Sequence, residues 1–349
     1  MSISSSPPSA AHGRSSAGLD VSAAFATTLD TPEHVRIAEE LGFRRAWLYD
    51  TPQQSPDVWM CLALAAERTH RIGLGPGVLV PALRNPMVNA SGAAALERLA
   101  PGRVAVAFGT GYTGRRAMGQ QPVSWAYLSR YVATFRALLR GETAEWEGSP
   151  LRMLHTAASL PSTPGSIPVY IGAIGPKGME IAASLGDGLF VAGGGVPGRA
   201  KSFEKVLYLA VGSVLDDGEA LSSERLRTAA GPGLAQVFHF SYELGGEEAV
   251  KALPGGPEWL AVVQDTPEAQ RHLAVHNGHL LHLNDADTAA WNAGAHTLVE
   301  HVTLTGTAGD VLTKVQDLAA NGVTEIVFQP AGDIRRELEA FADAVGIRR

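Results

Sequence analysis

Residues 171–190 read IGAIGPKGMEIAASLGDGLF, preceded by the apolar pair VY and followed by VAGGG. An apolar run, a glycine-rich turn, an amphipathic stretch and a second apolar run are typical of a strand–helix–strand unit in a parallel sheet. Glycine lets backbone amides approach a ligand closely, and a helix beginning after the turn points its N–H groups at that ligand. The turn therefore suits an anionic group such as a phosphate. An ordinary tight turn explains the same residues, so the choice between a phosphate site and a plain turn depends on the rest of the chain.

The same alternation runs along most of the chain and predicts a (β/α)₈ TIM barrel with a mainly parallel sheet. A doubly wound open sheet is the alternative, and the number of strands argues against it. Helical patterns separate most of the strands, including 124–141, 307–322 and the C-terminal stretch. The expected strands are 19–28, 44–50, 71–80, 103–111, 169–175, 188–195, 234–243 and 324–330.

Two insertions interrupt one barrel domain, which we place at 19–349. The stretch 142–167 is long enough for a hairpin or a lid, and 245–306 predicts a helical excursion. Residues 1–18 are rich in Ser, Pro and Ala, lack the apolar core of a signal peptide, and predict a disordered tail.

Composition excludes several classes of partner. The 349 residues carry a formal charge of −7, and no Lys/Arg cluster is suited to a nucleic-acid backbone. No apolar run approaches the length of a membrane span, so no membrane partner is expected. The single cysteine, Cys61, cannot form an internal disulfide, which favours a reducing, cytoplasmic setting.

Five segments at the expected strand ends resemble the luciferase-like superfamily of flavin- and deazaflavin-dependent enzymes. They are AEELGFRRAWLYD, RIGLGPGVLVPALRNPMVNA, ALERLAPGRVAVAFGTG, PVYIGAIGPKGMEIAASLGDGLF and ANGVTEIVFQP, in the family's order and spacing. The resemblance implies a TIM barrel that binds coenzyme F420 or FMN at the carboxyl ends of its strands. The segment GAIGPKGMEIA is more similar to the methylenetetrahydromethanopterin reductase-like branch, which favours F420 over FMN.

The resemblance also implies which residues hold the cofactor. Relatives in the deazaflavin branch carry a non-prolyl cis peptide in strand three, and the matching step here is Gly77-Val78. Lys177 either adds charge to the phosphate site or is a solvated first-turn residue. The backbone amides expected to cradle the cofactor phosphate belong to Gly172, Ala173, Gly175, Gly193 and Gly194.

Two departures from the family argue against one of its reactions. Sugar-phosphate dehydrogenases of the superfamily have a histidine where this chain has Thr51, and a glutamate where it has Tyr112. Both catalytic groups of that reaction are missing, so we do not expect it.

Several polar residues at the expected barrel mouth are candidates for chemistry. Tyr112 is the first choice for a proton donor or substrate hydrogen bond. Thr51 and Thr110 are placed to hydrogen-bond ring or substrate oxygens. Asp50 either faces the cofactor or caps the loop that follows it.

Charged and histidine residues further along the chain have two interpretations each. Arg115 and Arg116 either hold an anionic tail or substrate carboxylate, or lie on a surface loop. His276, His279 and His282 recur every three residues, but no acidic partner is obvious within that run, and we expect no metal site. A histidine reaching over the mouth as an acid–base group is one interpretation of them, and surface or packing histidines are the other.

The sequence therefore predicts an oxidoreductase that transfers hydride between coenzyme F420 and an organic substrate, a small molecule or a peptide. Reduction of a C=C or C=N bond fits the missing dehydrogenase pair. The first alternative is an FMN-dependent monooxygenase working with a flavin reductase, and the second is a cofactor-binding protein without turnover. The superfamily's usual assembly implies a homodimer.

Overall fold

A closed ring of eight parallel strands forms the centre of the molecule. The computed structural model describes residues 13–156, 159 and 167–347. The strand order is β3-β2-β1-β10-β9-β8-β7-β4, and parallel bridges from Leu74 to Val104 and from Leu79 to Phe108 join the two ends. The predicted TIM barrel is confirmed. Its strands are β1 (Asp20–Phe25), β2 (Arg45–Leu48), β3 (Gly73–Pro76), β4 (Val106–Phe108), β7 (Val169–Gly172), β8 (Gly188–Ala192), β9 (Val206–Val211) and β10 (Glu325–Gln329).

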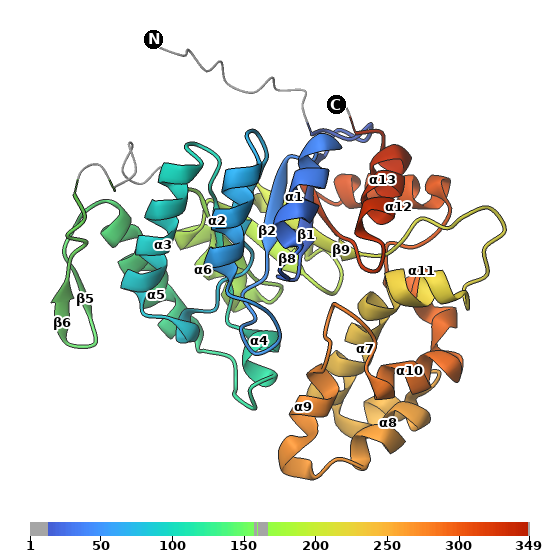
Figure 1. The fold of residues 1–349 in the computed structure, drawn as a ribbon. Coiled ribbons are helices and arrows are strands. Elements are labelled where there is room, and N and C mark those ends of the chain that lie inside the picture. The colour runs from blue at the N-terminus through green and yellow to red at the C-terminus, as the bar shows by residue number, and fades with distance from the viewer. Residues whose placement is uncertain (1–12, 157–158, 160–166, 348–349) are drawn as a thin grey trace.

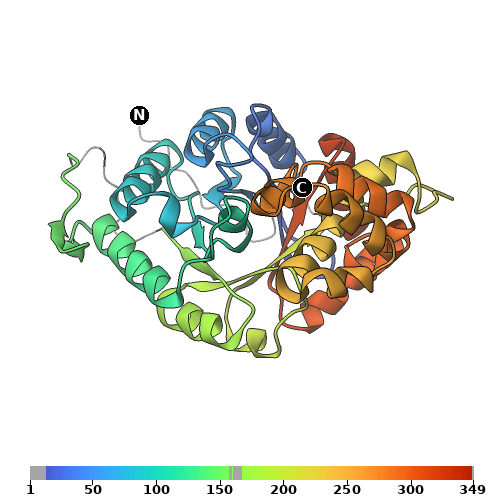
Figure 2. The same cartoon turned by 90° about the horizontal axis from the view of Figure 1, so that it is seen from below.

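Helices surround the ring, as the view along the barrel shows (Figure 2). Their starts follow local capping chemistry: the Asn85 side chain accepts a hydrogen bond from the Met87 amide, with Pro86 in the first turn. The surrounding helices are α1 (Thr31–Glu40), α2 (Val58–Arg68), α3 (Pro86–Leu99), α5 (Trp125–Leu139), α6 (Pro176–Leu185), α12 (Ala308–Ala320) and α13 (Ile334–Val345), with the short η1 (Pro81–Leu83), α4 (Tyr112–Arg116) and η3 (Gly198–Ser202) between them.

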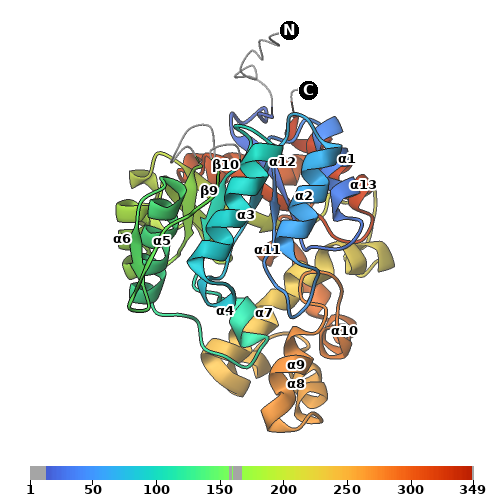
Figure 3. The same ribbon diagram turned by 60° about the vertical axis from the view of Figure 1, so that its left-hand side comes forward.

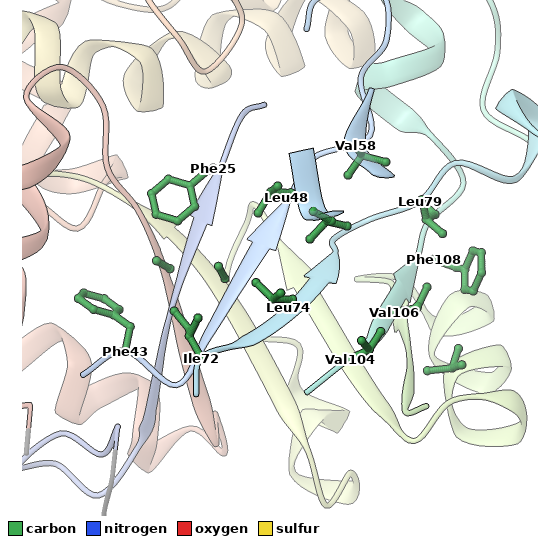
Figure 4. Packing of buried hydrophobic residues seen from close by; sticks show 14 of the residues in the cluster. Phe25, Phe43, Leu48, Val58, Ile72, Leu74, Leu79, Val104, Val106 and Phe108 are labelled. Atoms are coloured by element: carbon green, nitrogen blue, oxygen red, sulfur yellow. The ribbon is translucent and has the colours of Figure 1, made fainter. Parts of the chain in front are cut away.

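The barrel core has an outer and an inner layer. Apolar residues such as Leu48, Leu74 and Phe108 fill the space between strands and helices (Figure 4). Inside the ring, Trp47 is fully buried, and its ring centroid lies 5.5 Å from that of Phe190 in an edge-to-face contact. A Cβ at Gly77 would lie 2.8 Å from the Trp47 ring, so the glycine makes room for the indole.

The seventh strand is not where the sequence predicted it. Residues 234–243 belong to helix α7 (Glu224–Lys251), and the seventh barrel strand is β9, with the sequence VLYLAV, between β8 and β10. Leu226, Ala230, Leu234 and Phe238 recur every four residues and are all buried on one helix face. Helical periodicity therefore outweighs the apolar run that was taken for a strand.

A helical excursion spans residues 224–302, so it begins earlier than the expected residue 245, with α7. It has a hydrophobic cluster of its own, which includes Trp259 and Trp291, and it lies on the side of the barrel away from both termini (Figures 1 and 3). After α7 it contains α8 (Gly256–Gln264), η4 (Glu268–Gln270), α9 (Arg271–His276), α10 (Asp285–Asn292), η5 (Ala295–Leu298) and α11 (Val299–Val302).

The other insertion contains the expected hairpin, in which β5 (Ala144–Trp146) and β6 (Ser149–Leu151) pair antiparallel. Residues 157–158 and 160–166 of that insertion, and residues 1–12 of the expected tail, lie outside the described residues. Residues 13–18, which we grouped with the tail, are instead held on the barrel: the Ser16 hydroxyl donates to the Val345 carbonyl at 3.0 Å. Within the described chain, no helix has the length and apolarity needed to cross a membrane.

Candidate functional site

Two glycine loops lie side by side where the neighbouring strands β7 and β8 end. Helix α6 begins after Gly175 and has no side-chain cap, so the amides of its first turn keep their donor capacity. Gly193 and Gly194 have φ of 79° and 69°, and the Tyr208 hydroxyl donates to the Gly194 carbonyl at 2.7 Å. A Cβ at Gly175 or Gly194 would meet nothing within 4 Å. This exposed backbone at a helix N-terminus fits an anionic group such as a phosphate.

The other predicted members of this cradle occupy different positions. Ala173 is buried and Gly172 half-buried, whereas Lys177 is exposed. A Cβ at Gly172 would lie 3.4 Å from both the Phe108 carbonyl oxygen and a Val78 methyl carbon. Gly172 therefore borders the barrel wall, and Gly175 is the more open of the two.

Gly77 and Val78 lie at the mouth between β3 and β4. Their peptide bond is cis, as the resemblance implied. The Val78 side chain packs with the cluster inside the barrel, and a Cβ at Gly109 would come within 2.7 Å of it. Leu280, from the excursion, belongs to the same cluster. The excursion thus reaches down to the mouth where Val78 lies.

Tyr112 is the first residue of α4, and its hydroxyl is buried with no hydrogen-bond partner among the described residues. The ring packs on Phe240 with centroids 5.3 Å apart, and the Arg116 guanidinium carbon lies 4.7 Å from the ring centroid. Burial, with the nearby charge of Glu243, raises the pKa of Tyr112 to about 12. The phenol therefore stays protonated at neutral pH, beside the Glu243 carboxylate.

Asp50 is engaged by the protein itself. It is 2% exposed, and Arg84 Nη1 lies 2.7 and 2.8 Å from its two carboxylate oxygens. Burial raises the pKa of Asp50, and the Arg84 charge opposes that rise. Asp50 is therefore tied to the loop after β3, through Arg84 and the Val80 amide, and not to the loop that follows it in the sequence. The neighbouring Thr51 hydroxyl lies 3.0 Å from the Ser55 hydroxyl.

Of the other residues predicted near Tyr112, Thr110 and Arg115 make contacts elsewhere, whereas Arg116 lies against the Tyr112 ring. The Thr110 carbonyl accepts the Val123 amide at 3.0 Å. Arg115 donates from Nε to the Gln121 carbonyl and so stays within its own loop. Arg116 turns towards Tyr112 and lies 3.5 Å from the Glu243 carboxylate.

His276 and His279 are buried above the mouth, whereas His282 is exposed. His276 Nε2 lies 2.6 Å from Glu243 Oε1, and Gln54, on the loop after β2, donates to the His276 carbonyl at 2.6 Å. These contacts link the excursion to the barrel loops next to Tyr112.

Sequence reasoning missed Glu243 and His239 because both lie in the segment taken for a strand. Read as a helix, that segment places the two residues four positions apart on one face. This i, i+4 spacing of a histidine and a carboxylate was the available signal.

The chain is similar in sequence to one protein family and to enzymes of known activity. A family model described as luciferase-like monooxygenase matches residues 8–325. The 5,10-methylenetetrahydromethanopterin reductase of Archaeoglobus fulgidus is 26% identical over 320 residues, which cover 84% of this chain and 87% of that protein. An F420-dependent glucose-6-phosphate dehydrogenase of Nakamurella multipartita is 32% identical over 254 residues, which cover 67% and 71%.

A solved structure, the coenzyme F420-dependent tetrahydromethanopterin reductase of Methanopyrus kandleri, superposes with a TM-score of 0.72. The alignment covers 95% of this chain and 99% of that chain at 18% identity, which shows a shared fold.

Proposed function

The chain belongs to the luciferase-like monooxygenase family, and from this premise we propose that it transfers hydride between coenzyme F420 and a small organic substrate. The observation that carries the proposal is the uncapped N-terminus of α6 beside the open Gly193–Gly194 loop, a backbone site for a cofactor phosphate. The named relatives with F420-dependent activity support the deazaflavin as that cofactor.

When bound, the deazaflavin supplies or accepts the hydride. The residues of this chain bind, orient and exclude water. The first-turn amides of α6 hold the anionic part, and Val78 presents an apolar surface at the mouth. Leu280 adds a second apolar group from the excursion to the same cluster, and such groups help to exclude water.

We assign the proton to Tyr112. Its hydroxyl is buried and protonated across the neutral range, beside the Glu243 carboxylate, and in this scheme it turns its hydrogen bond to a substrate atom. Glu243 lies on the far side, hydrogen-bonded to His276, and connects the phenol to the interior of the excursion. Reduction of a polarised double bond needs one hydride and one proton, and Tyr112 is the proton donor in this scheme.

The proposal includes a cytoplasmic homodimer acting on a small molecule. An FMN-dependent monooxygenase that takes reduced flavin from a partner reductase is the second candidate, and the family's own description favours it. The phosphate cradle serves either cofactor, so the structure's backbone site alone does not separate them.

Paired titration of the purified protein with F420 and with FMN, followed by cofactor and tryptophan fluorescence, tests the proposal. We expect saturable binding of F420 and at least about tenfold weaker binding of FMN, a free-energy difference of about 1.4 kcal/mol. Tighter binding of FMN, together with oxygen consumption in the presence of a flavin reductase, would replace hydride transfer by the monooxygenase. Binding of neither cofactor would contradict both.

A further inference from the structure

Three buried histidines converge within the excursion. His239 lies in α7, His276 ends α9, and His279 follows in the next turn. Their exposed fractions are 2%, 4% and 8%. One ring nitrogen from each lies within 4.8 Å of the other two.

A carboxylate stands behind two of these imidazoles. His239 Nε2 lies 3.1 Å from Asp287 Oδ1, and His276 Nε2 lies 2.6 Å from Glu243 Oε1. Asp287 is itself fixed, since the Trp259 indole N–H donates to it at 2.8 Å. A histidine that ligates a metal ion almost always gives its other N–H to a carboxylate, a carbonyl or a water in this way.

One of the nitrogens that face inward has no hydrogen-bond partner among the described residues, and the other two are within hydrogen-bond distance of each other. His276 Nδ1 is buried and has no hydrogen-bond partner in the described part of the chain, and the Nδ1 atoms of His239 and His279 face each other at 3.0 Å. Leaving a buried polar atom unpaired costs about 1–3 kcal/mol.

We propose that His239, His276 and His279 bind one divalent transition-metal ion, with zinc the expected ion. Nitrogen-only ligands exclude the oxygen-seeking calcium and magnesium ions and suit zinc. Two nitrogens on a tetrahedral zinc ion lie about 3.3 Å apart, close to the 3.0 Å between His239 and His279. The third nitrogen has at most about 1.5 Å to close, and a water molecule completes the coordination.

The sequence predicted no metal site because no acidic partner was obvious among residues 272–284. The partners come from elsewhere: Glu243 from α7 and Asp287 from α10. Both elements belong to the excursion, so the complete constellation exists only once the excursion is folded.

An ion at this site would join α7 to the segment that roofs the mouth. Gln54 holds the His276 carbonyl, and Gln329, at the end of β10, donates to the Leu280 carbonyl at 3.1 Å. The metal would therefore fix Leu280 in the barrel interior. This inference does not depend on which cofactor the barrel binds.

Tag-free protein, stripped with a chelator and dialysed against Zn²⁺ or Co²⁺, tests the site. We expect one equivalent of metal per chain by elemental analysis, and a visible Co²⁺ absorption of low-coordinate type. His279→Ala removes a ligand and should abolish the stoichiometric binding. Glu243→Gln keeps the shape but weakens the support of His276, and should lower the affinity by about 10–100-fold.

His282→Ala is the matched control, because His282 lies three residues from His279 but is exposed. It should bind one equivalent like the wild type. Circular dichroism shows whether each variant is folded, and the wild-type titration stands whether or not His279→Ala folds. Wild-type protein without stoichiometric metal, or equal metal loss in His279→Ala and His282→Ala, would overturn the proposal.

Discussion

At position 175 one carboxylate should act in opposite directions on folding and on binding. Gly175 is the N-cap of α6, has β-region φ and ψ of −92° and 162°, and has open space for a Cβ. Aspartate is a favoured N-cap, so Gly175→Asp should raise the free energy of unfolding by a few tenths to about 1 kcal/mol. The same negative charge occupies the phosphate site, and F420 affinity should fall at least about tenfold.

The measurement pairs thermal unfolding with F420 fluorescence titration. Gly309→Asp places the same charge in the first turn of α12, also without a close contact, and should leave F420 affinity unchanged. Unaltered F420 binding in a folded Gly175→Asp protein would remove α6 from the cofactor site.

The Tyr112 hydroxyl should matter for turnover and not for stability. Because the hydroxyl is buried without a partner in the described residues, Tyr112→Phe should leave the free energy of unfolding within about 1 kcal/mol of the wild type, or raise it slightly. Loss of a proton donor should lower kcat about 100-fold or more with any substrate the enzyme reduces.

Denaturant unfolding measures the stability of Tyr112→Phe, and steady-state kinetics measure its kcat. Tyr127→Phe, on the outer helix α5 where the ring packs on Trp146, should change neither quantity strongly. A wild-type kcat in Tyr112→Phe would move the proton donor elsewhere.

Among elements, the contact of α7 with β9 depends on a small residue. A Cβ at Gly233 would lie 2.8 and 2.9 Å from two carbons of Val211, a β-branched side chain with little freedom to move. Glycine to alanine inside a helix normally stabilises by about 0.5–1 kcal/mol. We expect Gly233→Ala to destabilise instead, by about 1–3 kcal/mol, because the methyl group overpacks the contact.

Chemical denaturation measures this difference. Gly309→Ala in α12 is the matched substitution, since the nearest atom to its Cβ would be 3.9 Å away, and it should stabilise slightly. Equal effects of the two substitutions on the free energy of unfolding would show that the Val211 side chain moves aside.

The same region shows how far the sequence predicts the elements. Seven of the expected strands lie on barrel strands because each combines a short apolar run with flanking turn residues, as at 324–330 and β10. The eighth lies in α7 instead: Gly231, Pro232 and Gly233, residue types that commonly interrupt helices, are all buried inside that helix. Close packing against β9 and Leu283 uses their small size, and that tertiary contact cannot be seen in a local pattern.

The sequence could likewise predict only part of the candidate site. Loops that follow predicted strands, such as Gly175 and Gly193, could be placed at one end of the barrel because the carboxyl ends of parallel strands meet there. Glu243 and Leu280 could not, because they reach the mouth only through the path of a helical insertion that has no strand register to fix it.

At the scale of the molecule, a charged network joins the base of the excursion to the barrel. Arg225, in the first turn of α7, contacts Glu219 and lies 2.8 Å from Glu337 of α13. Arg336 contacts the same Glu337 at 2.9 Å and also pairs with Asp216. The barrel and the excursion have separate hydrophobic clusters, so this network is one of the places where their stabilities are coupled.

Glu219 makes that coupling depend on pH. The Arg225 and Ser223 side chains and the Asp216 amide outweigh the effect of burial and lower the pKa of Glu219 to about 2 from its usual 4.5. A lowered folded-state pKa stabilises the fold above about pH 4.5, and the contribution is lost as the pH falls towards 2. Glu219→Gln should therefore lower the free energy of unfolding by about 1.5–3 kcal/mol at neutral pH, the range for hydrogen bonds to charged groups, and by progressively less in acid.

Urea unfolding of both proteins between neutral pH and about pH 3 measures the gap between their free energies of unfolding. Glu224→Gln, which removes a largely exposed partner of Arg227, should show only a small gap at every pH. A Glu219→Gln gap that stays constant down to about pH 3 would mean that its carboxylate charge does not stabilise the junction.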